Sequence, residues 1–168
     1  MIEAVIRDIT RPGTEVVVSA ANGVGIMGRG VAGAISQVAG QSIIDEAKAL
    51  IKHRGKIFQT GEIYITGPGK MSRRGVRKIY HAVTMQYPGG LTSVNIVNIL
   101  MHKLLKGAIK GKRESIAIPG LGTGIGRLDR NIVANVMVGV AKQYDHKIKI
   151  RILDQGDDFI NEVKHLIG

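Results

Sequence analysis

Apolar residues recur along the chain at two different spacings, and the two kinds of segment alternate. Segments typical of strands have alternating apolar positions or short apolar runs, at residues 2–7, 16–18, 61–66, 76–84, 115–119 and 147–154. Segments typical of helices have apolar residues three and four positions apart, at about residues 31–38, 42–51, 92–108, 127–144 and 157–167. The alternation predicts an α/β fold in which helices cover both faces of a mixed sheet. No linker, repeat or low-complexity segment divides the chain.

The ends of individual elements carry more specific signals. Ser42 is expected to begin a helix, because its hydroxyl can accept from free amides and Asp45 supplies the acidic half of a capping box. Basic and isoleucine positions alternate over residues 147–152, which predicts a strand with one face exposed to water. Residues 70–78 are rich in lysine and arginine and are expected to form a basic loop.

Two glycine-rich stretches, residues 19–35 and 118–128, each run from the end of a buried strand into a helix. In open α/β sheets, ligands bind outside the carboxyl ends of the strands. Glycines there let backbone amides approach phosphate oxygens, and the start of a helix adds partial positive charge. One such stretch could simply form a tight turn, but two at equivalent strand ends favour a site that holds a diphosphate from both sides.

Other glycine-rich phosphate sites do not fit these stretches. Gly28, Gly30 and Gly33 have the spacing of the Rossmann fingerprint, but they do not follow the strand at once, and no acidic residue closes a second strand about 20 residues later. A Walker A loop is excluded, because neither stretch is followed by Gly-Lys-Ser/Thr. The Gly-x-Ser-x-Gly elbow of serine hydrolases is also absent.

The chain has a formal net charge of +11, from 24 Lys and Arg against 13 Asp and Glu. Such a field attracts polyanions, although it serves equally well to keep a protein soluble. A nucleic-acid partner would contact the basic segment through Lys70, Arg73, Arg74, Arg77 and Lys78. Aromatic residues make up only 4% and there is no Trp, which argues against a platform for stacking single-stranded bases.

The composition also bears on the cellular compartment of the protein and on the metals or cofactors that it could bind. Because cysteine is absent, disulfides and thiolate metal sites are excluded. The five histidines are scattered, so we expect no metal site, and no cofactor is indicated. No apolar run approaches the roughly 18 residues of a membrane span, and the first residues resemble a strand rather than a signal peptide. These features lead us to expect a cytoplasmic protein without a membrane partner.

Five short motifs, in order, resemble those of the macro domain family. They are Arg-Asp-Ile-Thr at 7–10, Val-Ser-Ala-Ala-Asn at 18–22, Gly-Arg-Gly-Val-Ala-Gly-Ala-Ile at 28–35, Tyr-His-Ala-Val at 80–83, and Ile-Pro-Gly-Leu-Gly-Thr-Gly-Ile-Gly at 118–126. The resemblance implies a three-layer α-β-α fold with a mixed, mostly parallel central sheet, formed by residues 1–168 as a single domain. It also implies a cleft that binds ADP-ribose, free or linked to a protein.

The resemblance assigns roles to individual residues. Asp8 and the Ile9 backbone would contact adenine, and Asn22 the distal ribose, while Gly30, Val31 and residues 122–126 would donate amides to the diphosphate. The full ligand-binding set comprises Asp8, Ile9, Ala21, Asn22, Gly28, Arg29, Gly30, Val31, Leu121, Gly122, Thr123, Gly124, Ile125 and Gly126. A purely structural interpretation remains open, in which Asp8 caps a turn and Asn22 holds a left-handed backbone.

Departures from the family pattern bear on catalysis. One hydrolase branch has an acid at the position of Ala32, and another has an acid near Gly126, where many members instead carry an aromatic residue. Arg29 replaces a glycine, and Ser19 replaces the first Asn of the Asn-Ala-Ala-Asn motif. We therefore expect a binding module first. The alternative is a hydrolase of ADP-ribosyl esters, O-acetyl-ADP-ribose or ADP-ribose 1''-phosphate.

Such a hydrolase would have no side-chain base at the familiar positions. Asn22 would orient a water that the substrate diphosphate activates, and Asp129 or Asp157 would be the next candidates for a base. His81 lies within a strand segment and is expected to be a core residue rather than a catalyst. A nucleic-acid-binding protein is the third interpretation.

Overall fold

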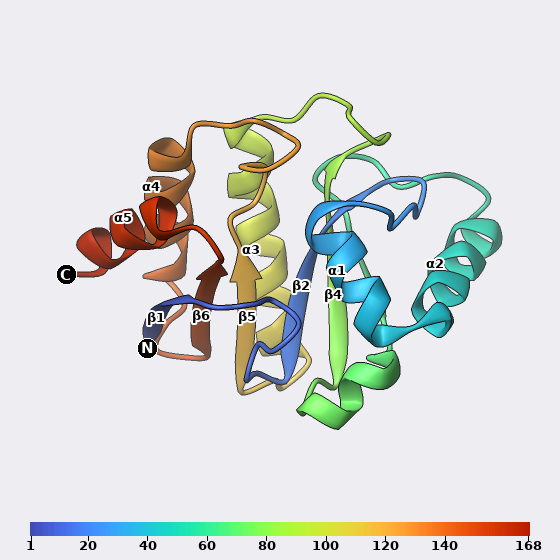
Figure 1. Ribbon diagram of the computed structural model, residues 1–168, viewed down its shortest axis with the longest axis horizontal. Coiled ribbons are helices and arrows are strands. Elements are labelled where there is room, and N and C mark those ends of the chain that lie inside the picture. Colours follow the sequence, from blue (N-terminus) through green and yellow to red (C-terminus); the bar gives the residue numbers. More distant parts are fainter.

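A computed structural model describes residues 1–168, which form three layers with a sheet between two groups of helices (Figure 1). The strands are β1 (Ile2–Ile6), β2 (Val16–Asn22), β3 (Ile63–Thr66), β4 (Lys78–Met85), β5 (Ser115–Pro119) and β6 (Lys149–Asp154). The helices are α1 (Gly30–Ala39), α2 (Gln41–Arg54), α3 (Val94–Lys110), α4 (Arg130–Ala141) and α5 (Asp157–Ile167), together with a short 3₁₀ helix, η1 (Gly69–Arg74).

The six strands form one sheet in the order β1-β6-β5-β2-β4-β3. Every neighbouring pair is parallel except β3 and β4, which are antiparallel. The predicted fold, a mixed and mostly parallel sheet with helices on both faces, is therefore confirmed. Because β2, β4, β5 and β6 point the same way, their carboxyl ends meet at one edge of the sheet, which is the upper edge in Figure 1.

Each face of the sheet has its own hydrophobic core, because successive strand residues point to opposite faces. Val16 and Val18 of β2 face α3, α4 and α5, in a cluster that also contains Ile116 of β5. Val17 of β2 and Ala117 of β5 face α1, α2 and η1. The uninterrupted apolar runs in the sequence follow from this burial on both sides. The predicted water-exposed face of β6 is found only in part, since Lys149 is exposed but Arg151 is half-buried and pairs with Glu3.

The predicted helices are present, but some of their ends differ. Helix α2 begins at Gln41 with Gly40 as its N-cap, and no side chain caps it, so the predicted capping box of Ser42 and Asp45 is wrong. Gly40 has φ 93° and connects α1 to α2 without a loop, which leaves no room for a cap at Ser42. The basic segment forms η1 over its first residues rather than a loop. None of the helices is both long and apolar enough to span a membrane.

Candidate ligand-binding site

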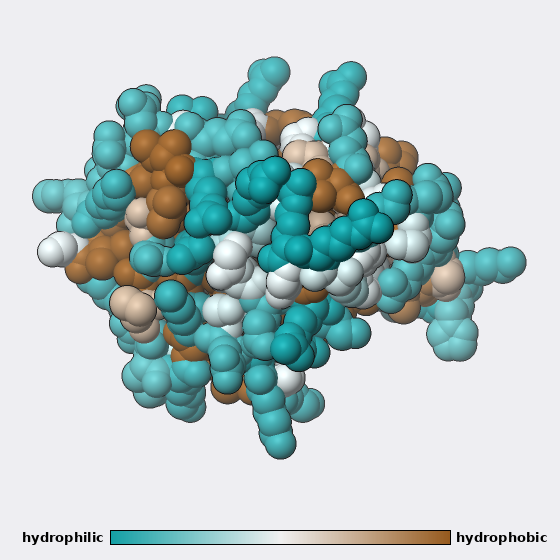
Figure 2. All heavy atoms as spheres, turned by 60° about the horizontal axis from the view of Figure 1, so that its bottom comes forward, coloured by the Kyte–Doolittle hydropathy of each residue, from teal (hydrophilic) through white to brown (hydrophobic).

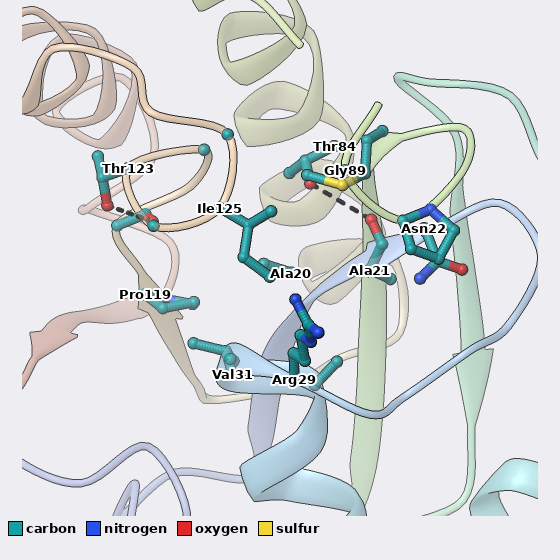
Figure 3. Close-up of a pocket in the computed structure, with 18 of the residues that line it drawn as sticks. Ala20, Ala21, Asn22, Arg29, Val31, Thr84, Gly89, Pro119, Thr123 and Ile125 are labelled. Atoms are coloured by element: carbon teal, nitrogen blue, oxygen red, sulfur yellow. Dashed lines mark hydrogen bonds between the residues drawn. The ribbon is translucent and has the colours of Figure 1, made fainter. Parts of the chain in front are cut away.

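A cavity of about 640 Å³ lies at the carboxyl ends of the parallel strands, where both glycine-rich loops meet (Figure 3). Its lining includes all of the predicted ligand-binding residues except Asp8, Ile9 and Leu121. The structure thus brings together two segments that are about 100 residues apart in the sequence. Pro119 and Asp154, the last residues of β5 and β6, also line the cavity.

The first loop is held by the side chain of Asn22, which ends β2. Its Oδ1 accepts from the backbone amides of Val24 and Ile26 at 3.2 and 3.1 Å, and its Nδ2 donates to the Ile26 carbonyl at 2.8 Å. Asn22 thus has a structural role, but not the left-handed backbone that the sequence left open: that prediction is wrong, because Asn22 belongs to β2 and does not have a positive φ. Asn22 also lines the cavity, and the second N–H of its Nδ2 group is free to donate to a ligand.

The start of α1 brings backbone amides to the cavity. Gly30 has φ 57°, a conformation that L side chains rarely adopt, so a glycine is needed here. Gly33 packs directly against the loop, since a Cβ there would lie 3.0 Å from the backbone carbon of Gly28. The first amides of a helix have no partner within it, so those of Gly30 and Val31 are free to bind an anion.

The second loop follows β5 and folds back on itself. The Thr123 hydroxyl donates to the Gly120 carbonyl at 2.9 Å, and the Leu128 amide donates to the Gly122 carbonyl at 2.9 Å. A Cβ on Gly126 would lie 2.7 Å from the Gly122 carbonyl oxygen, so the close approach requires a glycine. Ile125 reaches across to the first loop, where its Cδ1 would lie 3.7 Å from a Cβ at Gly30. The two loops therefore border the same space.

Three predicted residues lie outside the lining of the cavity. Asp8 caps a turn, because its Oδ1 accepts from the Thr10 amide at 2.9 Å and from the Thr10 hydroxyl at 2.8 Å. These hydrogen bonds, with the nearby Arg74 and Arg11 charges, lower the pKa of the Asp8 carboxyl. Ile9 and Leu121 are buried core residues. The Asp8 carboxylate is exposed and keeps its second oxygen free, so its adenine role stays a prediction.

Asp154 is a lining residue that the sequence reasoning missed, and it is the only carboxylate in the cavity wall. It ends β6, and its Oδ1 accepts from the Gln155 amide at 2.8 Å. Its place beside the second loop depends on the parallel pairing of β5 and β6, for which the sequence carries no signal. The two acids named as alternative bases lie elsewhere: Asp129 caps α4 by accepting from the Ile132 amide, and Asp157 begins α5.

His81 is fully buried in β4, as predicted for a core residue. Its Nε2 lies 2.8 Å from the Thr66 hydroxyl, and its ring stacks on Tyr64 with centroids 4.4 Å apart. Burial lowers the pKa of His81 to about 3, so the ring is neutral at pH 7. Its Nδ1 and the hydroxyl of Ser19, its neighbour in β2, are both buried without a hydrogen-bond partner.

The basic segment lies at the other end of the sheet, where β4 begins (Figure 1). Figure 2 turns this lower end toward the reader and shows a largely hydrophilic face. Two of its arginines are engaged within the protein: Arg74 donates to the Thr10 carbonyl at 2.8 Å, and Arg77 pairs with Glu15 at 3.3 Å. Lys70 and Arg73 are exposed, and Lys78 is half-buried.

Comparisons with known proteins agree with the motifs in the sequence. The family model of the macro domain matches residues 18–137. An uncharacterised protein of Aquifex aeolicus is 31% identical over 171 residues, which cover 99% of this chain and 98% of that protein. An O-acetyl-ADP-ribose deacetylase of Salmonella typhimurium is 31% identical over 138 residues, which cover 82% of this chain and 75% of the enzyme.

Solved structures share the fold. The Oceanobacillus iheyensis macrodomain with ADP superimposes with a TM-score of 0.88 at 24% identity, covering 99% of this chain and 89% of that one. The Trypanosoma brucei macrodomain in complex with ADP-ribose gives 0.84 at 20% identity, covering 99% and 69%. The family match spans more than half of the sequence, and the cavity lies where the two glycine-rich loops meet. The chain belongs to the macro domain family.

Proposed function

We propose that the protein binds ADP-ribose, free or attached to a protein, in the cavity between the two glycine-rich loops. The observation that carries this proposal is the convergence of both loops and the first amides of α1 on one space of about 640 Å³. A cavity of that size suits a ligand of several hundred daltons. The macrodomain structures with ADP and with ADP-ribose support the same ligand class.

In this proposal the diphosphate lies between the start of α1 and the second loop. The free amides of Gly30 and Val31 donate to it from one side, and those of residues 122–126 donate from the other. Asn22 lines the end of the cavity near β4 and offers its remaining N–H to the distal ribose. Asp8 accepts a hydrogen bond from the exocyclic amine of adenine through its free oxygen.

Hydrolysis is a second candidate, favoured by the Salmonella relative that is named a deacetylase. The cavity offers little for proton transfer, because Ala32 and Gly126 line it without a carboxylate. Asp154 is the one acid in its wall, at the end where β5 and β6 stop. Since general acid–base assistance contributes about 10²–10⁴-fold, hydrolysis by this site would be slow. We therefore place binding before catalysis.

A nucleic-acid partner is the third proposal, and it has less support. The net charge of +11 favours contact with a polyanion. Of the basic segment, however, Arg74 and Arg77 are engaged within the protein, which leaves Lys70, Arg73 and the half-buried Lys78 for phosphate contacts.

A calorimetric titration with ADP-ribose tests the main proposal. We expect a dissociation constant in the micromolar range or below, about −8 kcal/mol or better. Asp8→Asn retains an oxygen for the Thr10 amide but loses the charge, so it should cost about 1–3 kcal/mol in affinity and erase the preference for adenine over guanine. Asp45→Asn, an exposed substitution on α2, is the matched control. If the Asp8→Asn variant binds ADP-ribose as tightly as the parent and keeps the preference for adenine over guanine, the adenine assignment is refuted.

A further inference from the structure

The polar side chains that line the cavity differ in whether they are free to meet a ligand. Asn22 makes three hydrogen bonds within its own loop. The hydroxyls of Thr84 and Thr123 donate to the carbonyls of Ala21 and Gly120 at 3.3 and 2.9 Å. The Asp154 carboxylate accepts from a backbone amide at 2.8 Å.

Arg29 is the remaining polar residue of the lining, and it is unengaged. It makes no capping hydrogen bond to α1 and takes part in none of the ion pairs of the structure. In Figure 3 its side chain extends from the start of α1 into the space between Ala21 and Ile125. The cavity thus contains one free positive charge, aimed at the place where the two loops meet.

The position of Arg29 is unfavourable for the protein alone. It is the N-cap of α1, where the helix already presents partial positive charge, so a cation there is repelled. Its backbone, with φ −139° and ψ 164°, is extended and would accept any residue. An anion between the guanidinium and the first amides of α1 would turn this repulsion into a combined attraction.

The cavity offers few side-chain contacts for a sugar by comparison. Gly126 has no side chain, and a Cβ there would lie 2.7 Å from both the Gly122 carbonyl oxygen and the Thr92 methyl carbon. No ring can therefore be placed at this point to stack on a ribose. Asn22 keeps only one free N–H for hydroxyl groups, because its other polar positions hold the loop.

We infer that Arg29 binds the diphosphate of the ligand through its guanidinium, so that the site selects nucleoside diphosphates by charge and takes little of its affinity from the distal ribose. This inference rests on the proposed function and adds a specificity-determining residue to it. The planar guanidinium fork matches phosphate oxygens in a bidentate way, which a lysine cannot reproduce. ADP and ADP-ribose then belong to one class of ligand, and AMP to a weaker one.

The test is a calorimetric titration of the parent, Arg29→Gln and Arg29→Lys with ADP-ribose, ADP and AMP. For the parent we expect ADP to bind within about tenfold of ADP-ribose, and AMP at least about tenfold more weakly than ADP. Arg29→Gln should weaken ADP and ADP-ribose equally, by roughly 10- to 100-fold, and flatten the dependence of affinity on salt. Arg29→Lys should keep the salt dependence and recover part of the affinity. Arg73→Gln, an exposed arginine on η1, is the matched control and should change nothing.

The outcomes separate this inference from the proposed function. If Arg29→Gln binds ADP as tightly as the parent while both bind ADP-ribose, the contact with the diphosphate is refuted and the proposed function stands. A loss confined to ADP-ribose would also refute it, because it would place Arg29 beside the distal ribose. A parent protein that binds neither ligand would overturn the proposed function and this inference together.

Discussion

Burial of His81 should make the stability of the fold depend on pH between 7 and 5. The folded pKa is about 3, against an ordinary value of 6.5, because burial disfavours the charged ring. Below pH 6.5 the His81 side chain binds a proton in the unfolded chain but stays unprotonated in the folded protein. This contribution to stability is therefore complete above pH 6.5 and is lost progressively as the pH falls toward 3. At about 1.4 kcal/mol per pH unit, lowering the pH from 7 to 5 should cost about 2 kcal/mol.

Urea unfolding followed by circular dichroism at pH 7 and pH 5 measures this loss. His81→Phe is the comparison, because its ring can stack on Tyr64 as the imidazole does but cannot take a proton. The variant should be less stable at pH 7, since the hydrogen bond with the Thr66 hydroxyl is removed, yet it should lose about 2 kcal/mol less than the parent on acidification. Carboxylates titrate alike in both proteins and cancel in the difference. Equal losses in parent and variant would show that burial does not lower the pKa of His81, which would refute the reasoning.

Three further substitutions test other parts of the structure. Asn22→Ala removes the bonds that hold the first loop, so it should lower the free energy of unfolding by about 1–3 kcal/mol and weaken ADP-ribose binding, as seen by thermal melting and calorimetry. Gly126→Ala places a Cβ 2.7 Å from the Gly122 carbonyl oxygen, so the second loop has to shift, and the change should weaken ADP-ribose binding and lower the melting temperature. Replacing Lys70 and Arg73 by Gln should reduce the salt slope of any duplex DNA binding, by about 0.9 for each phosphate that is no longer neutralised, without affecting ADP-ribose binding; duplex affinity that keeps its slope would exclude this surface.

Much of the architecture could be predicted because the burial of each strand and helix is reflected in the order of apolar and polar residues within that segment. Residues 16–18 and 115–119 are apolar on both faces, which indicated strands covered by helices on each side, and the structure confirms them. The helix expected from about residue 92 is present as α3, which Ser93 caps by accepting from the Ile96 amide. The start of α2 was predicted wrongly because a glycine with a positive φ between two helices can replace a polar cap, and that depends on how α1 ends.

The sequence predicted the parts of the site that are formed by backbone within one loop. It did not predict the residues that reach the site because two strands are paired in the sheet. Glycines at the ends of β2 and β5 signalled the two loops without any knowledge of the sheet order. Asp154 joins them only because β6 pairs with β5, and these strands are distant in the sequence. The engagement of Arg74 with the Thr10 carbonyl was likewise invisible in the sequence, since the two residues are 64 positions apart.

Binding of ADP-ribose between the two glycine-rich loops is the proposal on which the others depend, and NMR titration of ¹⁵N-labelled protein with ADP-ribose tests it residue by residue. We predict saturable shifts at one-to-one stoichiometry for the amides of Gly30, Val31 and residues 122–126. The amides of η1, at the opposite end of the sheet, should not move. Saturable shifts confined to η1, or no shifts at millimolar ADP-ribose, would contradict the proposal.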